Sequence, residues 1–255
     1  MPFHFRNLRL RAAGVHLGIS AFVAACASLL VFTFWYAPPF ASIAGGARLF
    51  VLLVAVDVVM GPALTFVVAS PGKPRREFVR DLSFIVVLQL AAFGYGIYSM
   101  ALARPVALVF ELVEFRLVTA ADVESASLTE APIHLRDLSW RGPRLIAAVR
   151  PTDPQEQLRT VELGLAGIPL AAMPRYWRDY SAHADAAWRT ARPVSTLLAR
   201  YPASADAVEK IATAAAQPAP SLRFLPLRAR HAEWVAVIAL PGARVVGYLP
   251  LDGFF

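Results

Sequence analysis

The chain has 255 residues, of which 57% are hydrophobic and 17% charged, and its formal net charge is +7. A basic balance can indicate nucleic-acid binding, but here the charge is unevenly spread. Residues 1–103 carry 8 Lys/Arg against 3 Asp/Glu, whereas residues 104–255 carry 17 against 15. Because the surplus flanks long apolar segments, we interpret it as a membrane-topology signal and expect no nucleic-acid partner.

Three apolar segments predict transmembrane helices at about residues 15–36, 47–69 and 82–102. A helix of such a length rises roughly 30 Å, which is enough to cross the hydrocarbon core of a bilayer. The first apolar run is longer than the core of a typical signal peptide, which favours a retained span over a cleaved one. The sequence therefore predicts a membrane domain over residues 1–103.

The distribution of basic residues predicts the orientation of these helices. Arg6, Arg9 and Arg11 precede the first span, and Lys73, Arg75, Arg76 and Arg80 lie between the second and third. The connection over residues 37–46 carries no charge. Basic residues collect in short cytoplasmic segments. We therefore expect an inner-membrane protein in contact with lipid, with a cytoplasmic N-terminus and a periplasmic domain over residues 104–255.

Two polar residues occur inside the predicted spans. Asp57 is near the middle of the second, and Gln89 is at a similar depth in the third. An ionised carboxylate at the bilayer centre costs about 3 kcal/mol on insertion scales, so such a residue usually faces another helix or a wet cavity. We expect the Gln89 amide to donate to Asp57. The carboxylate is either a binding or relay group or a polar clamp between two spans.

The residues after Asp57 predict a bend in the second span. Gly61 is followed by Pro62, which removes a helix hydrogen bond, and the Thr65 hydroxyl is placed to bond the loosened carbonyls. Asp57, Gly61, Pro62, Thr65 and Gln89 therefore form a candidate polar, kinked face. His16, near the inner edge of the first span, is expected to be an interfacial histidine and not a metal ligand.

Small residues mark candidate helix-packing positions. Gly14 and Gly18 form a G-x-x-x-G pattern at the start of the first span, and Gly94 and Gly96 lie in the third. Small side chains allow helices to approach closely in a membrane. The pattern is also common by chance in apolar spans.

The second half of the chain predicts an α+β domain. β-branched and aromatic runs predict strands at residues 106–118 (one or two), 144–149, 222–228, 234–240 and 244–249. Helices are predicted at residues 154–165, 176–190, 194–200 and 204–216. With strands at both ends and helices between them, we expect the first and last strands to share one sheet.

The sequence contains no recognisable catalytic constellation. His134, His183 and His231 are far apart and do not fit zinc spacing, and there is no Walker loop, dinucleotide fingerprint or G-x-S-x-G elbow. Cys26 is the only cysteine, so no disulfide is expected within the chain. We therefore predict no catalytic residues, no cofactor and no metal, and we do not expect an enzyme.

Several segments of the membrane half resemble a known family. They are Phe34-Trp35-Tyr36, the stretch LLVAVDVVMGPALT over residues 52–65, the turn Pro71-Gly72-Lys73, LQLAA over residues 88–92, and Ala103-Arg104-Pro105-Val106. Together these resemble the type IV pilin accessory proteins of the TfpX/TfpZ kind, over roughly residues 15–120. The resemblance implies an inner-membrane chaperone that binds its cognate major pilin and promotes pilin stability and assembly into pili.

Other classes of membrane protein are alternatives to this resemblance. A membrane-anchored periplasmic sensor, or a scaffold subunit of another envelope assembly, is the main alternative. A sensor needs an output domain, whereas the cytoplasmic segments are only about 14 and 12 residues long. A transporter or channel subunit is less favoured because three spans without an internal repeat rarely enclose a pathway. The sequence leaves open the oligomeric state and the identity of the pilin.

Overall fold

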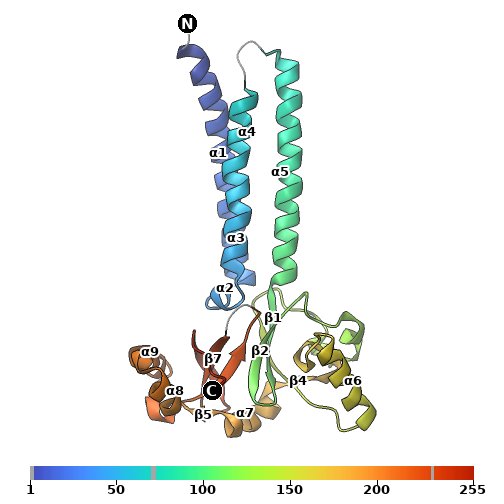
Figure 1. Cartoon of the computed structure of the whole chain (residues 1–255), viewed down its shortest axis with the longest axis vertical. Coiled ribbons are helices and arrows are strands. Elements are labelled where there is room, and N and C mark those ends of the chain that lie inside the picture. The colour runs from blue at the N-terminus through green and yellow to red at the C-terminus, as the bar shows by residue number, and fades with distance from the viewer. Residues whose placement is uncertain (1–2, 70–72, 231–232) are drawn as a thin grey trace. The chain divides into compact units, whose positions relative to one another are not determined.

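A computed structural model describes residues 3–69, 73–230 and 233–255. The chain divides into two compact units, Met1–Ala103 and Arg104–Phe255. The first is helical and the second is built around a sheet (Figure 1). Pro71 and Gly72 of the predicted basic turn, and His231, lie outside the described residues.

The helical unit contains three long rods. The first is α1 (Phe3–Leu30) with the π-helical turn η1 (Val31–Trp35), and the short α2 (Phe40–Ile43) follows it. The second comprises α3 (Gly46–Ala55), the π-helical segment η2 (Val56–Met60) and α4 (Gly61–Val68), and the third is α5 (Arg75–Ala103). Arg9–Trp35, Gly46–Val68 and Arg75–Ala103 are long and apolar enough to cross a membrane. The predicted three apolar helices are thus confirmed.

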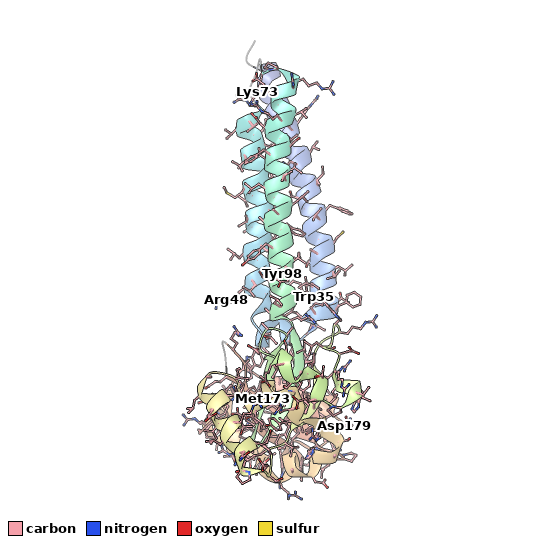
Figure 2. The ribbon with its side chains drawn as sticks, turned by 90° about the vertical axis from the view of Figure 1, so that its right-hand side faces the viewer. Trp35, Arg48, Lys73, Tyr98, Met173 and Asp179 are labelled. Carbon is pink, nitrogen blue, oxygen red and sulfur yellow. The ribbon has the colours of Figure 1, made fainter. Side chains whose placement is uncertain are left out.

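Most apolar side chains of these helices point away from the unit. Figure 2 shows them projecting along the whole length of the rods, with Trp35, Arg48 and Tyr98 at one end of the helical unit and Lys73 at the other. Phe22 and Phe84, for example, are largely exposed. Such a surface is unfavourable in water and favourable against lipid chains.

Tyr36 holds one end of the three rods together. Its side chain is fully buried, and its hydroxyl donates to the Met100 carbonyl at 3.1 Å. A Cβ at Gly46 would lie 2.3 Å from the Tyr36 ring, so only glycine leaves room for the ring there. Tyr36 therefore joins the end of the first rod, the start of the second and the end of α5.

The second unit contains an eight-stranded sheet with the order β4-β3-β1-β2-β6-β7-β8, and β5 also pairs with β6. Pairs β1–β3 and β2–β6 are parallel and the others antiparallel. The strands are β1 (Pro105–Glu111), β2 (Glu114–Thr119), β3 (Arg144–Ala148), β4 (Trp177–Asp179), β5 (Arg192–Pro193), β6 (Arg223–Arg228), β7 (Glu233–Ala239) and β8 (Arg244–Leu249). As predicted, strands from both ends of the unit share one sheet.

The sheet has a hydrophobic core at each end. One core joins β1 and β3 to Met173, Tyr176 and Trp177, and the other joins β6, β7 and β8 to two helices. The helices of this unit are α6 (Pro154–Leu165), α7 (Ala184–Thr190), α8 (Val194–Arg200) and α9 (Ala205–Ala214).

The predicted helix over residues 176–190 is wrong in its first half. Trp177–Asp179 form β4, which pairs with β3, and a 3-10 turn follows before α7 begins at Ala184. The cause is tertiary: the Trp177 ring is buried in the core, and its indole N–H donates to the Ala171 carbonyl at 2.8 Å. This contact outweighs the local helix propensity of the segment.

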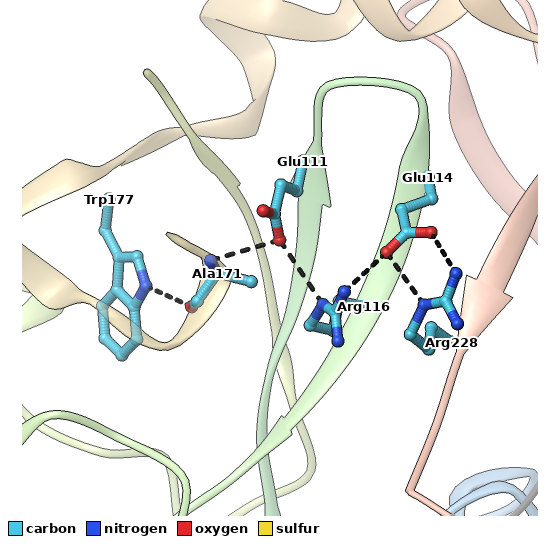
Figure 3. Close-up of polar contacts among 6 residues, drawn as sticks. All are labelled: Glu111, Glu114, Arg116, Ala171, Trp177 and Arg228. Atoms are coloured by element: carbon cyan, nitrogen blue, oxygen red, sulfur yellow. Dashed lines mark hydrogen bonds and ion pairs between the residues drawn. The ribbon is translucent and has the colours of Figure 1, made fainter. Parts of the chain in front are cut away.

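A small network of charges joins the two halves of the sheet (Figure 3). Only two residue pairs, Phe115–Leu227 and Arg116–Arg228, link β2 to β6. The Glu114 carboxylate, which is mostly buried, accepts from Arg116 at 2.9 Å and from Arg228 at 3.1 and 3.2 Å. Glu114 therefore reinforces the short pairing between β2 and β6.

Removing this carboxylate should destabilise the sheet unit. We expect Glu114→Ala to lower the free energy of unfolding by about 2–4 kcal/mol, because it leaves two guanidinium groups without their shared partner. The control is Arg230→Ala, which removes an exposed ion pair with Asp122 and should cost less than about 1 kcal/mol. Denaturant unfolding of the full chain in detergent, followed by tryptophan fluorescence, measures both. Equal losses would contradict the role given to Glu114.

Candidate functional site

A groove of about 850 Å³ runs along the helical unit, and we call it the helix groove. One wall belongs to α1 and the other to α5, while η2 and α4 form its floor. In Figure 1, α1 lies against α4 and α5 stands apart from α1. The lining is mainly apolar, and Val15, Ile19 and Leu90 on its walls are exposed. Apart from basic residues, the polar side chains that line the groove are those of His16, Ser20, Asp57, Thr65 and Gln89.

Asp57, on the floor of the groove, is paired with Gln89, which comes from the α5 wall. The Gln89 Nε2 donates to Asp57 Oδ1 at 3.2 Å and to the Asp57 backbone carbonyl at 3.1 Å. The contact to the carboxylate is the pairing that the sequence predicts. The contact to the backbone is an additional one.

The backbone contact compensates for Pro62. In a π-helical turn the carbonyl of residue i pairs with the N–H of residue i+5. For Asp57 that residue is Pro62, which has no N–H. In an apolar environment an unpaired carbonyl is expensive, and the Gln89 amide supplies the missing donor. The π-helical segment η2 ends directly before Gly61-Pro62, where the sequence predicts a bend.

Gly61 makes room for this arrangement. A Cβ at Gly61 would lie 2.0 Å from the Gln89 Nε2. Gln89 therefore reaches Asp57 across a position where a Cβ would displace its amide. Asp57, Gly61, Pro62 and Gln89 act as one structural group.

His16 and Thr65 contact each other across two helices. The Thr65 hydroxyl lies 2.6 Å from the Nδ1 of His16, whereas the sequence predicts a bond to a carbonyl of its own helix. His16 is half-buried in the groove between α1 and α4, and its place at the membrane interface stays a prediction. Whether His16 faces Thr65 depends on how α1 is rotated about its axis against α4. The sequence contains no signal for that rotation. The pair ties α1 to the floor of the groove.

The four candidate packing glycines behave differently. A Cβ at Gly96 would lie 2.3 Å from Leu53 Cδ1, so this glycine allows close contact between α5 and α3. A Cβ at Gly14, Gly18 or Gly94 would meet no atom within 4 Å. Within the described part of the chain these three do not pack helices together, so their role in helix packing stays a prediction.

The described residues contain no group of three or more His, Cys, Asp and Glu side chains that could hold a metal ion. His134 instead pairs with Asp179 at 2.8 Å on the surface of the sheet unit. The polar groups of the helix groove can donate and accept hydrogen bonds.

Comparison with known proteins identifies the family. A family model described as "Fimbrial assembly protein FimB" matches residues 5–45. The fimbrial assembly proteins of Dichelobacter nodosus serogroups I and E1 are each 33% identical over 232 residues, which covers 89% of this chain and 90% of theirs. The chain belongs to the family of fimbrial assembly proteins. This confirms the predicted membership of the type IV pilus accessory proteins.

The similarity to this family extends through both units. A third relative, the fimbrial assembly protein of D. nodosus serogroups C1 and C2, is 41% identical over 121 residues, which covers 48% of this chain and 92% of the relative. The matched residues 5–45 of the family model include most of α1, one wall of the helix groove. No solved structure is significantly similar to this fimbrial assembly protein.

Filling the space at Gly61 should break the polar pair. We expect Gly61→Ala to displace Gln89 and to cost about 0.6–2 kcal/mol, the usual value of a polar contact between membrane helices. Gly94→Ala is the control, because its Cβ meets no neighbour. In a Gln89→Ala background, Gly61→Ala should cost little, because no side chain remains to be displaced. Thermal unfolding in detergent measures the wild type, the three single variants and the Gly61→Ala/Gln89→Ala double variant, and additive effects would argue against this coupling.

Proposed function

We propose that this protein is an inner-membrane accessory protein that binds a type IV pilin and promotes its stability and assembly into pili. Its helical unit crosses the membrane and its sheet unit is periplasmic. The names of the relatives, which are fimbrial assembly proteins, support a role in pilus assembly. The helix groove is the observation that carries the proposal of pilin binding.

The groove has the form expected of a seat for one apolar helix. The family resemblance implies a client that, before assembly, is a single apolar membrane helix with a globular head. Lipid chains are as apolar as leucine, so helices associate in a membrane through close packing and interhelical hydrogen bonds. The groove offers both, because its lining is mainly apolar and also carries the polar side chains of Asp57, Gln89, His16 and Thr65.

The open shape of the groove suits a chaperone. A client that moves on into a filament has to leave its partner, so a shallow, reversible contact is more useful than an enclosed one. This role requires no chemical step, and we propose that the protein is not an enzyme. The remaining apolar surface of the three helices is then covered by lipid.

Site-specific photo-crosslinking tests whether the groove holds the pilin. A photo-reactive residue at Ile19 or Leu90, which line the groove, should give an adduct with the pilin in cells. The controls are Phe22 and Val87, which are exposed on the same two helices but do not line the groove. Adducts at the controls and none at the groove positions would refute this mode of binding.

Reporter fusions test the proposed orientation. Because the basic residues cluster at Lys73–Arg80, a phosphatase fused after Phe255 should be active and one fused near Arg76 should be silent. Both fusions are measured in the same strain, with protein amounts compared by immunoblot. The reverse pattern of activity would place the sheet unit in the cytoplasm.

A further inference from the structure

Helix α6 of the sheet unit presents an apolar stripe to the outside. Leu158, Val161 and Leu165 are 60%, 58% and 86% exposed, and none of the residues of α6 is fully buried. At 100° per residue, the three side chains fall within about 60° of one another. Leu163, on the opposite side, packs partly against the core near Ile168. The helix therefore turns its larger apolar face outwards.

The tip of the β1–β2 hairpin extends this apolar surface. Its two connecting residues, Leu112 and Val113, are 46% and 61% exposed. Leu112 has a φ of 57°, in the left-handed region where a leucine is disfavoured by about 1 kcal/mol and glycine or asparagine is usual. Leu112 and Val161 line the same hollow, of about 530 Å³, so the stripe and the hairpin tip are continuous.

Polar contacts hold α6 in place. Asp153 caps its first turn by accepting from the Glu156 N–H at 2.9 Å. The Glu156 carboxylate accepts from the Tyr176 hydroxyl and from Arg175 at 3.3 Å, and these contacts lower its pKa. Arg175 also pairs with Glu130. The apolar stripe is thus displayed on a fixed helix, so little ordering entropy is lost when it binds.

The hollow beside the stripe is lined by Arg116, Arg150 and the carboxylate of Glu111. Arg116 and Glu111 pair with each other at 3.4 Å, so their charges offset, and Glu111 also accepts from the Ala171 N–H at 3.2 Å. Arg150 is exposed and has no ion-pair partner in the part of the chain that the structure describes. A partner seated here would therefore place a carboxylate beside its apolar side chains.

We infer that this α6 surface (Leu112, Val113, Arg150, Leu158, Val161 and Leu165) docks a segment of the pilin head in which apolar side chains adjoin a carboxylate. The inference rests on the proposed function and adds a second contact, outside the helix groove. Charge disfavours a second copy of this chain as the occupant. A symmetric contact would bring the Arg150 cations of both copies into one interface, and like charges at an interface are costly.

Photo-crosslinking on α6 tests the docking directly in cells that make the pilin. A photo-reactive residue at Val161 or Leu165 should give a pilin adduct. The same residue at Arg159, exposed on α6 about 120° from the stripe, should give at least tenfold less. Adducts at Val161 and Leu165 with a second copy of this chain, or with lipid alone, would overturn the inference.

Charge variants test the role of Arg150. Arg150→Glu should reduce the pilin that co-purifies with the full chain at least fivefold, Arg150→Lys should retain most of it, and Arg159→Glu should leave it unchanged. Thermal unfolding verifies that the variants remain folded. Equal binding by Arg150→Glu and wild type would overturn the electrostatic part of the inference.

Crosslinking at Ile19, in the helix groove, distinguishes failure of this inference from failure of the proposed function. If Ile19 crosslinks the pilin and Val161 and Leu165 do not, the α6 surface is refuted while pilin binding by the groove stands. If none of the three positions captures the pilin, both proposals fall. If Val161 and Leu165 capture it and Ile19 does not, the docking stands and the groove loses its role.

Discussion

The hydrogen bond from Gln89 to the Asp57 backbone fixes how α5 lies against the second rod. Pro62 removes an N–H from a helix whose surroundings are apolar, and the carbonyl that loses its partner needs another donor. Gln89 is that donor, and Gly61 leaves the space through which it reaches. One unpaired carbonyl thus explains why the proline, the glycine, the π-helical segment and the glutamine occur together. The Asp57 carboxylate, bonded to the same amide, becomes part of the floor of the groove.

The shape of the groove depends on which helices are joined by polar contacts. Gln89 ties α5 to the second rod, and His16 ties α1 to the same rod through Thr65. Both walls are therefore attached to a common floor, and Tyr36 joins the rods at one end. In water an apolar groove of this kind would tend to close. Against lipid there is no such driving force, so a few polar contacts suffice to hold it open.

The sequence predicts those features that depend on the length of an apolar segment, on the period of its apolar residues or on the depth of a residue within a span. The three apolar helices follow from hydropathy, and the Asp57–Gln89 contact follows from equal depth in antiparallel spans. Features that depend on rotation or tertiary contact are missed. His16 meets Thr65 only because α1 is turned towards α4, and Trp177 joins a strand because the core accepts its ring. The apolar period of α6 indicates an amphipathic helix, but it does not reveal that the larger apolar face is left exposed.

The two proposed contacts with the pilin, at the helix groove and at the α6 surface, rely on different interactions. The helix groove offers shape and a few hydrogen bonds in an apolar environment, whereas the α6 surface offers apolar burial beside a cation in water. Once one contact has formed, the other becomes intramolecular, so two weak sites together give a high occupancy. Each can nevertheless be exchanged separately for a contact within a growing filament. Tight binding at either site would oppose that transfer, and this explains why an assembly factor would combine an open groove with a small, shallow docking surface.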